Sequence, residues 1–542
     1  MNEGFFKMER PENEPCKLYK AGSPEQIALM AEVEKQSQEV VEIPVIINGK
    51  EIFTDDVIDI VEPHNHSHVI AHLHRGGEKE LKDAIDGTQK VAKEWADMPW
   101  ENRAAIFLRA AELMSVNGPC RNKLLAATML GQSKNMWEAE IDIAELFDFM
   151  RFDSWGLQEI YKGQPGPTPG ALNRLEYRPL EGFVAALTPF NFTSIGGNLP
   201  SAPAIAGGVS VWKPSTTSSL ANYYFFKVLQ AAGLPDGVIN FVPSKGTDYS
   251  KYVITDPRMS GFHFTGSTGV FNSVWREVGS HIERYHSYPR LVGETGGKDF
   301  IFADPSANVD ALLSGMMRAA FSYAGQKCSA ASRAYVPASI WPELKEKMHE
   351  VMKNIYAGDI RDPKCFCNAV IDAAAFKKIS GYIEEAKNSP DAEVVEGGQC
   401  DDSVGYFIQP TVILAKTPTY KTMIEEIFGP VLTVYVYEDE KEEEAIELCD
   451  TSTAYGLTGA LYAEDRKAIN DISHKLSQAA GNFYINEKPT GAVVGQQPFG
   501  GSRASGTNDK AGTSTNMARW VTQRAVKEVL VPETKILMPH ME

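Results

Sequence analysis

The chain has 542 residues, with 53 Lys and Arg against 71 Asp and Glu, so its formal net charge is −18. Hydrophobic residues make up 43% and charged residues 23%, as in folded globular proteins. The acidic balance excludes a nucleic-acid backbone or an anionic membrane surface as the main partner, and no apolar run reaches the ~20 residues that span a bilayer.

The N-terminus and the cysteines indicate the compartment. The first twenty residues carry scattered Glu and no apolar core, so they predict neither a secretory signal nor a transit peptide. The seven cysteines form no CxxC pair, which is typical of a reducing compartment without a disulfide framework. We therefore expect a cytoplasmic protein, or a mitochondrial-matrix protein if the host is eukaryotic.

The first half of the chain changes from helical to strand–helix periodicity. A helix is expected in the polar N-terminal region, and apolar residues recur on one face of the three expected helices after it. Short β-rich runs separated by helix-like stretches follow them. Such spacing requires parallel crossovers, so it predicts a doubly wound α/β sheet that binds ligands at the carboxyl ends of its strands. The expected helices lie at about 24–39, 79–97, 101–116, 136–160 and 219–232, and the strands at Phe183–Leu187, Val209–Trp212, Val238–Val242 and Phe262–Phe264.

A second strand–helix alternation follows the Gly-rich segment 293–298 and predicts a second α/β domain over 296–490. The first region then comprises 1–168 and 182–295. Segments 169–181 and 513–535 look like exposed strands, which need to pair with each other or with a second subunit. In the second domain the expected strands are Phe300–Ala303, Ala334–Pro337, Val431–Tyr437 and Phe483–Asn486, and the helices lie near 308–324, 341–356, 373–388 and 440–450.

Three side chains in loop segments suit nucleophilic chemistry. Cys328 lies in Gly-Gln-Lys-Cys-Ser-Ala, where Lys327 and local N–H dipoles would favour its thiolate. Glu294 in the Gly-rich segment suits a general base for water, and Asn191 after Pro-Phe suits an oxyanion donor. Each also has a structural explanation: a buried thiol, a turn acid or helix N-cap, and an Asx-turn.

The order of six short motifs is more specific than any one of them. Pro-Phe-Asn, Lys-Pro-Ser, Phe-Thr-Gly-Ser, Glu-Thr-Gly-Gly-Lys, Gly-Gln-Lys-Cys and Glu-Ile-Phe-Gly-Pro follow one another as in the aldehyde dehydrogenase superfamily, which the chain resembles. Segments 494–501 and 503–510, with 13–16 and 63–66, are similar to the stand-alone Δ1-pyrroline-5-carboxylate dehydrogenases. These oxidise L-glutamate γ-semialdehyde to L-glutamate, the second step of proline catabolism.

The resemblance implies a catalytic role for each of the three side chains. Cys328 would attack the aldehyde to form a hemithioacetal, which loses hydride to NAD and leaves a thioester. The Asn191 amide and the Cys328 backbone N–H would hold the oxyanion. Glu294 would activate the water that cleaves the thioester. The first region would then bind the dinucleotide, 296–490 would be the catalytic domain, and the two exposed strands would serve oligomerisation.

The resemblance also implies the binding residues. For the cofactor, Lys213 would bind the adenosine ribose, Gly266 and Ser267 the pyrophosphate, Glu426 the nicotinamide ribose, and Phe428 would pack beside the nicotinamide ring. The substrate residues fall into two sets, with Ser329, Gly491 and Ala492 at the α-carboxylate, and Phe192 and Phe499 as walls of the aliphatic chain.

Three positions depart from the family pattern. Thr216 stands where many members carry the Glu that favours NAD, so NADP is also an expected cofactor. Phe271 replaces a Gly and suggests a different grip on the phosphates. Ala492 replaces a Ser, so the hydroxyl is absent while the backbone N–H can still donate. We expect the same small-molecule substrate with altered affinity, and a homodimer or a higher homo-oligomer.

The sequence leaves other functions open. The chemistry needs no metal, so we expect the histidine cluster at 64, 66, 68, 72 and 74 to form a surface strand pair rather than a metal site. Within the enzyme class, the alternative is a broader semialdehyde or aliphatic aldehyde dehydrogenase. Outside it, the alternative is a catalytically silent member with a binding role, which the joint presence of Cys328, Glu294 and Asn191 disfavours.

Overall fold

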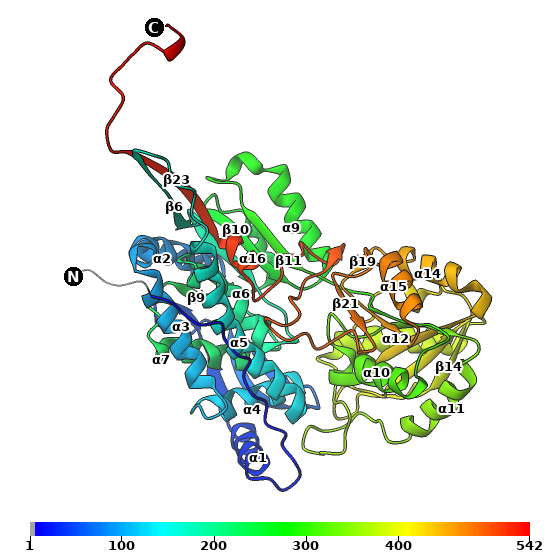
Figure 1. Ribbon diagram of the computed structural model, residues 1–542. Coiled ribbons are helices and arrows are strands. Elements are labelled where there is room, and N and C mark those ends of the chain that lie inside the picture. Colours follow the sequence, from blue (N-terminus) through cyan, green and yellow to red (C-terminus); the bar gives the residue numbers. More distant parts are fainter. Residues whose placement is uncertain (1–5, 542) are drawn as a thin grey trace.

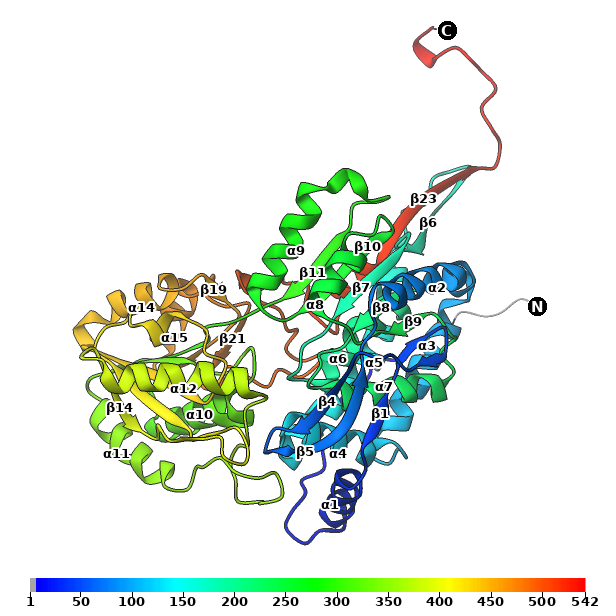
Figure 2. The ribbon, with the colours of Figure 1, turned by 180° about the vertical axis from the view of Figure 1, so that it is seen from behind.

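The computed structural model describes residues 6–541. These residues form two α/β lobes and a two-stranded arm that projects from the first lobe (Figure 1). The first lobe, blue to green, contains most of the N-terminal half, and the second, yellow to orange, contains the later half. Seen from behind, the arm and the C-terminus extend away from the second lobe (Figure 2). The predicted α/β fold with parallel sheets is confirmed.

The first lobe is built on a seven-stranded sheet. Five adjacent strands, from one edge to β9 (Ile239–Phe241), run parallel. Two short antiparallel strands complete the other edge. Every residue of Met259–Thr265 is buried, as expected for a parallel strand covered on both faces. In spatial order the strands are β11 (Arg290–Glu294), β10 (Met259–Thr265), β7 (Phe183–Leu187), β8 (Ser210–Lys213), β9 (Ile239–Phe241), β2 (Val45–Ile47) and β3 (Lys50–Ile52).

Helices cover this sheet, and a small sheet of β1 (Val41–Ile43), β5 (Asn65–His74) and β4 (Val57–Glu62) lies beside it. The four expected N-terminal helices and the helix at 219–232 are confirmed to within three residues. The helix α4, the fourth in chain order, was not predicted from the sequence. The helices are α1 (Pro24–Ser37), α2 (Glu78–Asp97), α3 (Trp100–Met114), α4 (Arg121–Gln132), α5 (Met136–Tyr161), α6 (Thr193–Ile205), α7 (Ser219–Ala232), α8 (Gly246–Tyr249) and α9 (Thr268–Ser280).

The second lobe has its own seven-stranded sheet, parallel except for the edge strand β14. Alternate residues of one strand enter different cores: Ile301 and Ala303 pack on one face, Phe300 and Phe302 on the other. The sheet is therefore covered on both faces, as a doubly wound fold requires. The spatial order is β14 (Ala392–Glu396), β17 (Thr411–Ala415), β18 (Val431–Tyr437), β13 (Arg333–Pro337), β12 (Phe300–Ala303), β20 (Thr458–Tyr462) and β21 (Asn482–Ile485).

Two groups of helices supply these two cores. Leu312, Met316 and Leu344 join the first face, whereas Ile446 and Ile469 join the second. The helices are α10 (Val309–Phe321), α11 (Trp341–Met352), α12 (Ala373–Asn388), α13 (Lys421–Ile424), α14 (Glu442–Thr451) and α15 (Arg466–Lys475). Two short two-stranded antiparallel sheets complete the lobe, β15 (Cys400–Asp401) with β16 (Phe407–Ile408) and β19 (Tyr455–Gly456) with β22 (Ser502–Arg503).

The projecting arm consists of β6 (Ala171–Pro179) and β23 (Val521–Val529), which pair antiparallel along their whole length. The two segments expected to be exposed strands therefore pair with each other within one chain. Part of the expected C-terminal strand is helical, because α16 (Ser514–Met517) begins with Thr513, whose side chain accepts the N–H of Asn516.

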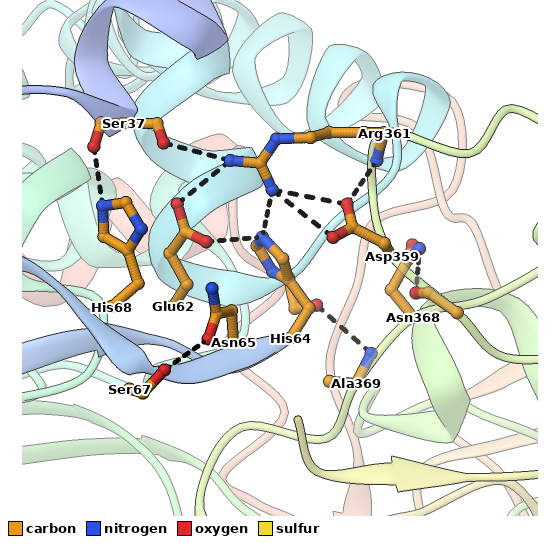
Figure 3. Close-up of polar contacts among 12 residues, drawn as sticks. Ser37, Glu62, His64, Asn65, Ser67, His68, Asp359, Arg361, Asn368 and Ala369 are labelled. Atoms are coloured by element: carbon orange, nitrogen blue, oxygen red, sulfur yellow. Dashed lines mark hydrogen bonds and ion pairs between the residues drawn. The ribbon is translucent and has the colours of Figure 1, made fainter. Parts of the chain in front are cut away.

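A polar joint connects the β4–β5 turn of the first lobe to the 359–369 segment of the second (Figure 3). Arg361 reaches across with Nη2 3.3 Å from Oε1 of Glu62 and 3.1 Å from Oγ of Ser37. Its Nη1 lies 3.2 Å from Nε2 of His64, whose side chain is fully buried. The expectation of a purely surface histidine cluster was therefore wrong at His64, which the second lobe covers.

The other histidines of the cluster lie on β5 and have protein partners. Nε2 of His66 is 2.8 Å from the carbonyl of Asp402, and His72 pairs with Asp59 at 2.8 Å. His74, also buried, pairs with Glu42 at 2.9 Å. Within residues 6–541, no three His, Cys, Asp or Glu side chains are arranged as metal ligands.

Candidate active site

The site residues predicted from the sequence lie at facing ends of the two large sheets. Lys213 ends β8, Glu294 ends β11 and Gly266 follows β10, all at carboxyl ends of the first sheet. Cys328 precedes β13 and Glu426 precedes β18, at amino ends of the second sheet. Because parallel strands present like ends on one edge, each group of residues converges on one side of its sheet.

Backbone geometry places Cys328 in a loop with unusual conformation. After α10, Tyr323 and Ala324 have φ of 51° and Gly325 has φ of 66°, so three consecutive residues are left-handed. A Cβ on Gly325 would lie 2.2 Å from the carbonyl oxygen of Gly429. Glycine is therefore required here, and the strained turn fixes the loop that carries Cys328.

The Cys328 thiol is half-buried and has an acidic environment. Burial and then the carboxyls of Asp299 and Glu294 raise its pKa well above the usual range. Lys327 does not offset this, because its ammonium lies 2.7 Å from Oε2 of Glu138. The expectation that Lys327 favours the thiolate was therefore wrong, because that ammonium pairs with Glu138 and the pKa of the thiol is raised.

Asn191 is buried and lies against the Cys328 loop. Its Nδ2 donates to the carbonyl of Gln326 at 3.1 Å, two residues before the thiol. Gln326 is held in turn by the N–H of Ile371, which donates to Oε1 at 2.8 Å. The Asn191 side chain thus contacts the loop that carries Cys328 and forms no Asx-turn, and the Glu294 carboxyl is close enough to raise the pKa of the same thiol.

Glu294 ends a strand and does not cap a helix. Its Oε2 accepts the N–H of Gly501 at 3.0 Å. A Cβ on Gly500 or Gly506 would lie 3.2 Å from a carboxylate oxygen, so glycines line this group closely. Burial raises the pKa of Glu294 to about 8, with the Gly501 N–H and Lys510 acting in the opposite direction. Such a carboxyl is suited to accept a proton near neutral pH.

The residues expected at the adenosine and pyrophosphate lie where a dinucleotide could be held. The buried ammonium of Lys213 donates to the carbonyl of Pro214 at 3.4 Å, and burial lowers its pKa to about 8. Ser267 caps α9, its Oγ accepting the N–H of Val270 at 3.3 Å. A Cβ on Gly266 would lie 2.7 Å from the Phe264 ring, so the chain passes close to the sheet there.

The residues expected at the nicotinamide contact the segment that joins the two lobes and the Pro-Phe-Asn motif of the first lobe. Oε1 of Glu426 accepts the N–H of Gly297 at 3.0 Å. Phe428 has φ of 62°, and its ring meets Phe190 edge-to-face at 5.8 Å between centroids. Phe190 was not predicted as a site residue, although it lies within the Pro-Phe-Asn motif.

Phe271 lies in the core of the first lobe. Its ring is buried and stacks 5.7 Å from the Phe264 ring. A Cβ on Gly293 would lie 2.3 Å from it, so the phenyl group fills space beside β11. This packing accounts for the residue without a role at the phosphates.

The substrate residues from two distant segments meet through a residue that the sequence analysis missed. Oγ of Ser329 lies 2.7 Å from Oγ1 of Thr490, which directly precedes Gly491. Gly491 has φ of 85°, and Ala492 beside it is half-buried. Thr490 could have been suspected from the sequence only because it directly precedes the predicted turn at Gly491 and Ala492.

The two aromatic residues expected along the substrate chain occupy different environments. Phe192 meets Tyr323 edge-to-face at 6.5 Å between ring centroids. Phe499 is half-buried and its carbonyl accepts the N–H of Ala511 at 3.0 Å. The N-terminal segment supports the same region, because Nδ2 of Asn13 donates to the carbonyl of Val494 at 2.7 Å.

Comparison with known proteins agrees with this arrangement. Residues 52–526 match the aldehyde dehydrogenase family, and the chain belongs to that family. Within it, the chain is 49% identical to the mitochondrial Δ1-pyrroline-5-carboxylate dehydrogenase of Dictyostelium discoideum, over 98% of this chain and 96% of that protein. It is 46% identical to the human mitochondrial enzyme of the same name, over 96% and 92%.

A solved structure gives the same result for the fold. The Mycobacterium tuberculosis Δ1-pyrroline-5-carboxylate dehydrogenase, crystallised with NAD, superposes with a TM-score of 0.96 at 46% identity and covers 100% of both chains. Within residues 6–541, no helix is long and apolar enough to cross a membrane.

Proposed function

We propose that this chain oxidises L-glutamate γ-semialdehyde, formed from Δ1-pyrroline-5-carboxylate, to L-glutamate with NAD, the second step of proline catabolism. The contact between the Asn191 amide and the Gln326 carbonyl, two residues before Cys328, supports the proposal, because an oxyanion donor has to lie near the nucleophile. The named activity of the relatives supports the substrate.

The first step joins the Cys328 sulfur to the aldehyde carbon. The thiol proton passes to solvent water, because only the thiolate is nucleophilic, and the carbonyl oxygen becomes an oxyanion as its π bond to carbon breaks. The Asn191 amide and the Cys328 backbone N–H stabilise that oxygen, and one such donor contributes on the order of 3 kcal/mol. Hydride loss from the hemithioacetal then leaves a thioester on Cys328.

The residues at the strand ends fit a nicotinamide dinucleotide. Lys213 has a buried ammonium that forms no ion pair within residues 6–541, which suits ribose hydroxyls. Ser267 stands at the N-terminus of the 13-residue helix α9, which suits pyrophosphate, and Glu426 and Phe428 would meet the nicotinamide half. Bound NAD would supply the hydride acceptor. Thr216 places no carboxylate near the ribose, so we propose NADP as an alternative cofactor.

Glu294 completes the cycle by cleaving the thioester. Its carboxylate takes a proton from water as the oxygen attacks the thioester carbon, which releases glutamate and restores the thiol. The contact of Ser329 with Thr490 supports a site for the substrate α-carboxylate, together with the backbone of Gly491 and Ala492. Phe192 and Phe499 would enclose the aliphatic chain.

We also propose a homodimer or a higher homo-oligomer that assembles through the arm. Leu172, Val529 and Leu530 are 54%, 45% and 59% exposed there, and an apolar two-stranded edge needs cover. The eukaryotic relatives named mitochondrial support the mitochondrial matrix for a eukaryotic host and the cytoplasm otherwise.

The experiment that tests the activity is an absorbance assay for NADH. The purified protein should reduce NAD with the semialdehyde at a far higher kcat/KM than with succinate semialdehyde or propanal. Cys328→Ala should abolish turnover. Cys400→Ala, at another half-buried thiol, is the matched control and should retain it. Equal rates with propanal would favour the broader dehydrogenase, and no NADH with any aldehyde would favour the silent member.

A further inference from the structure

One buried cation beside the site has no part in the proposed reaction. Lys134 stands between α4 and α5, and its side chain is 0% exposed. Its ammonium lies 2.8 Å from Oδ2 of Asp142 on α5, so opposite charges compensate each other inside the protein. Burial lowers the pKa of Lys134, and Asp142 acts against that shift.

The same ammonium lies over two aromatic rings from different loops. It is 4.0 Å from the centroid of Phe192 and 4.6 Å from that of Tyr323. Phe192 directly follows Asn191, and Tyr323 begins the left-handed turn that leads to Cys328. A desolvated cation attracts the faces of both rings, so this ammonium joins the two loops.

Asp142 extends the connection to the helix that follows Asn191. Its Oδ2 also accepts the N–H of Thr193 at 2.9 Å, and its Oδ1 accepts the N–H of Ser194 at 2.8 Å. These are the first two residues of α6, whose N–H groups have no partner within the helix. The carboxylate therefore anchors the Asn191 segment, and Lys134 compensates its buried charge.

Neighbouring charges on α5 act on the same two loops. Glu138 pairs with Lys327 at 2.7 Å, beside Cys328. Glu145 accepts a hydrogen bond from Oγ of Ser194 at 2.7 Å. Side chains of α5 thus contact both the Cys328 loop and the Asn191 segment. The Lys134 ammonium lies between these two segments, against one aromatic ring from each.

We propose that Lys134 is a positioning residue, which holds the Asn191 amide and the Cys328 thiol at the separation that oxyanion stabilisation requires. This inference rests on the proposed function. Lys134 acts through Phe192 and Tyr323 without contact to the substrate. A small error in such a separation is expected to lower kcat by up to about a hundredfold.

The test compares Lys134→Met with Lys134→Arg, which keeps the charge. Each kcat is divided by the amount of Cys328 that iodoacetamide alkylates, because alkylation needs the thiol and no oxyanion donor. We expect Lys134→Met to lower this normalised kcat more than about fivefold while the KM for NAD changes less than about twofold. Lys134→Arg should recover part of the loss.

Two further variants keep the test decisive. Lys123→Met removes an exposed ammonium that lies 4.0 Å from the Tyr224 ring, far along α4 from any site residue, and should leave kcat unchanged. If Lys134→Met does not fold, Tyr323→Leu removes one ring and leaves the ion pair with Asp142. The proposal would be overturned by a normalised kcat within about fivefold of wild type in Lys134→Met or, if that variant does not fold, in Tyr323→Leu. A wild-type protein inactive on the semialdehyde would instead contradict the proposed function.

Discussion

At the scale of single residues, burial sets the protonation of the reacting groups. The thiol of Cys328 has a raised pKa because it is half-buried among carboxyls, and its neighbour Lys327 is neutralised by Glu138. The carboxyl of Glu294 has a pKa near 8 for the same reason. Neither result follows from the local sequence, because both depend on burial and on partners in other segments, such as Asp299 for Cys328 and Gly501 for Glu294.

The raised pKa of Glu294 predicts a pH dependence. The base form is the carboxylate, so kcat should rise with pH through about 8 and fall by a factor of ten per pH unit well below that value. Glu294→Gln should lower kcat and remove the inflection near 8, and leave only the rise at higher pH that belongs to the Cys328 thiol. Stopped-flow kcat measurements from pH 6 to about 9.5 check the profile. A wild-type profile that is flat across this range would exclude Glu294 as the base.

The turn at Gly491 and Ala492 predicts a gain of affinity. Ala492→Ser adds a hydroxyl beside the proposed carboxylate site, next to the Ser329–Thr490 contact. We expect the KM for the semialdehyde to fall by about tenfold or more, because a hydrogen bond to a charged group contributes about 1.5–3 kcal/mol. Steady-state kinetics with saturating NAD measure it. An unchanged or higher KM would remove Ala492 from the carboxylate site.

At the scale of elements, the strained turn before Cys328 predicts a conformational requirement. Gly325→Ala would place a Cβ 2.2 Å from the Gly429 carbonyl at φ of 66°. We expect a cost of at least about 2 kcal/mol in stability and a large fall in kcat. Gly381→Ala, within α12 and with open space around its Cβ, should instead stabilise by about 0.5–1 kcal/mol. Thermal melting compares the two, and equal melting temperatures would contradict the strain.

Elements with a strong pattern could be predicted from the sequence, and weaker ones could not. The run Val431–Tyr437 was found because it is long and β-branched, whereas β20 contains Gly459 and Ala460, which have low strand propensity. The motifs located Cys328, Glu294 and Asn191. Thr490 and Lys134 were not found, because their roles come from contacts between segments that only the fold brings together.

At the scale of the whole molecule, the projecting arm predicts the state of association. The double variant Leu172→Glu and Leu530→Glu would place two charges on the exposed apolar surface of the arm. We expect this double variant to sediment as a monomer and the wild type as a dimer or larger. Ile27→Glu, on the exposed face of α1 at 61% exposure, is the matched control and should sediment as the wild type does. A monomeric wild type, or a double variant that still associates, would exclude the arm as the interface.

The central claim is that the sulfur of Cys328 carries the substrate as a thioester. Glu294→Gln protein is mixed with NAD and the semialdehyde, quenched in acid and weighed intact, and the adduct is then located by peptide mapping. The account predicts a mass increase of one glutamyl acyl group, confined to Cys328 and formed together with NADH. NADH formation without any adduct on Cys328 would contradict it.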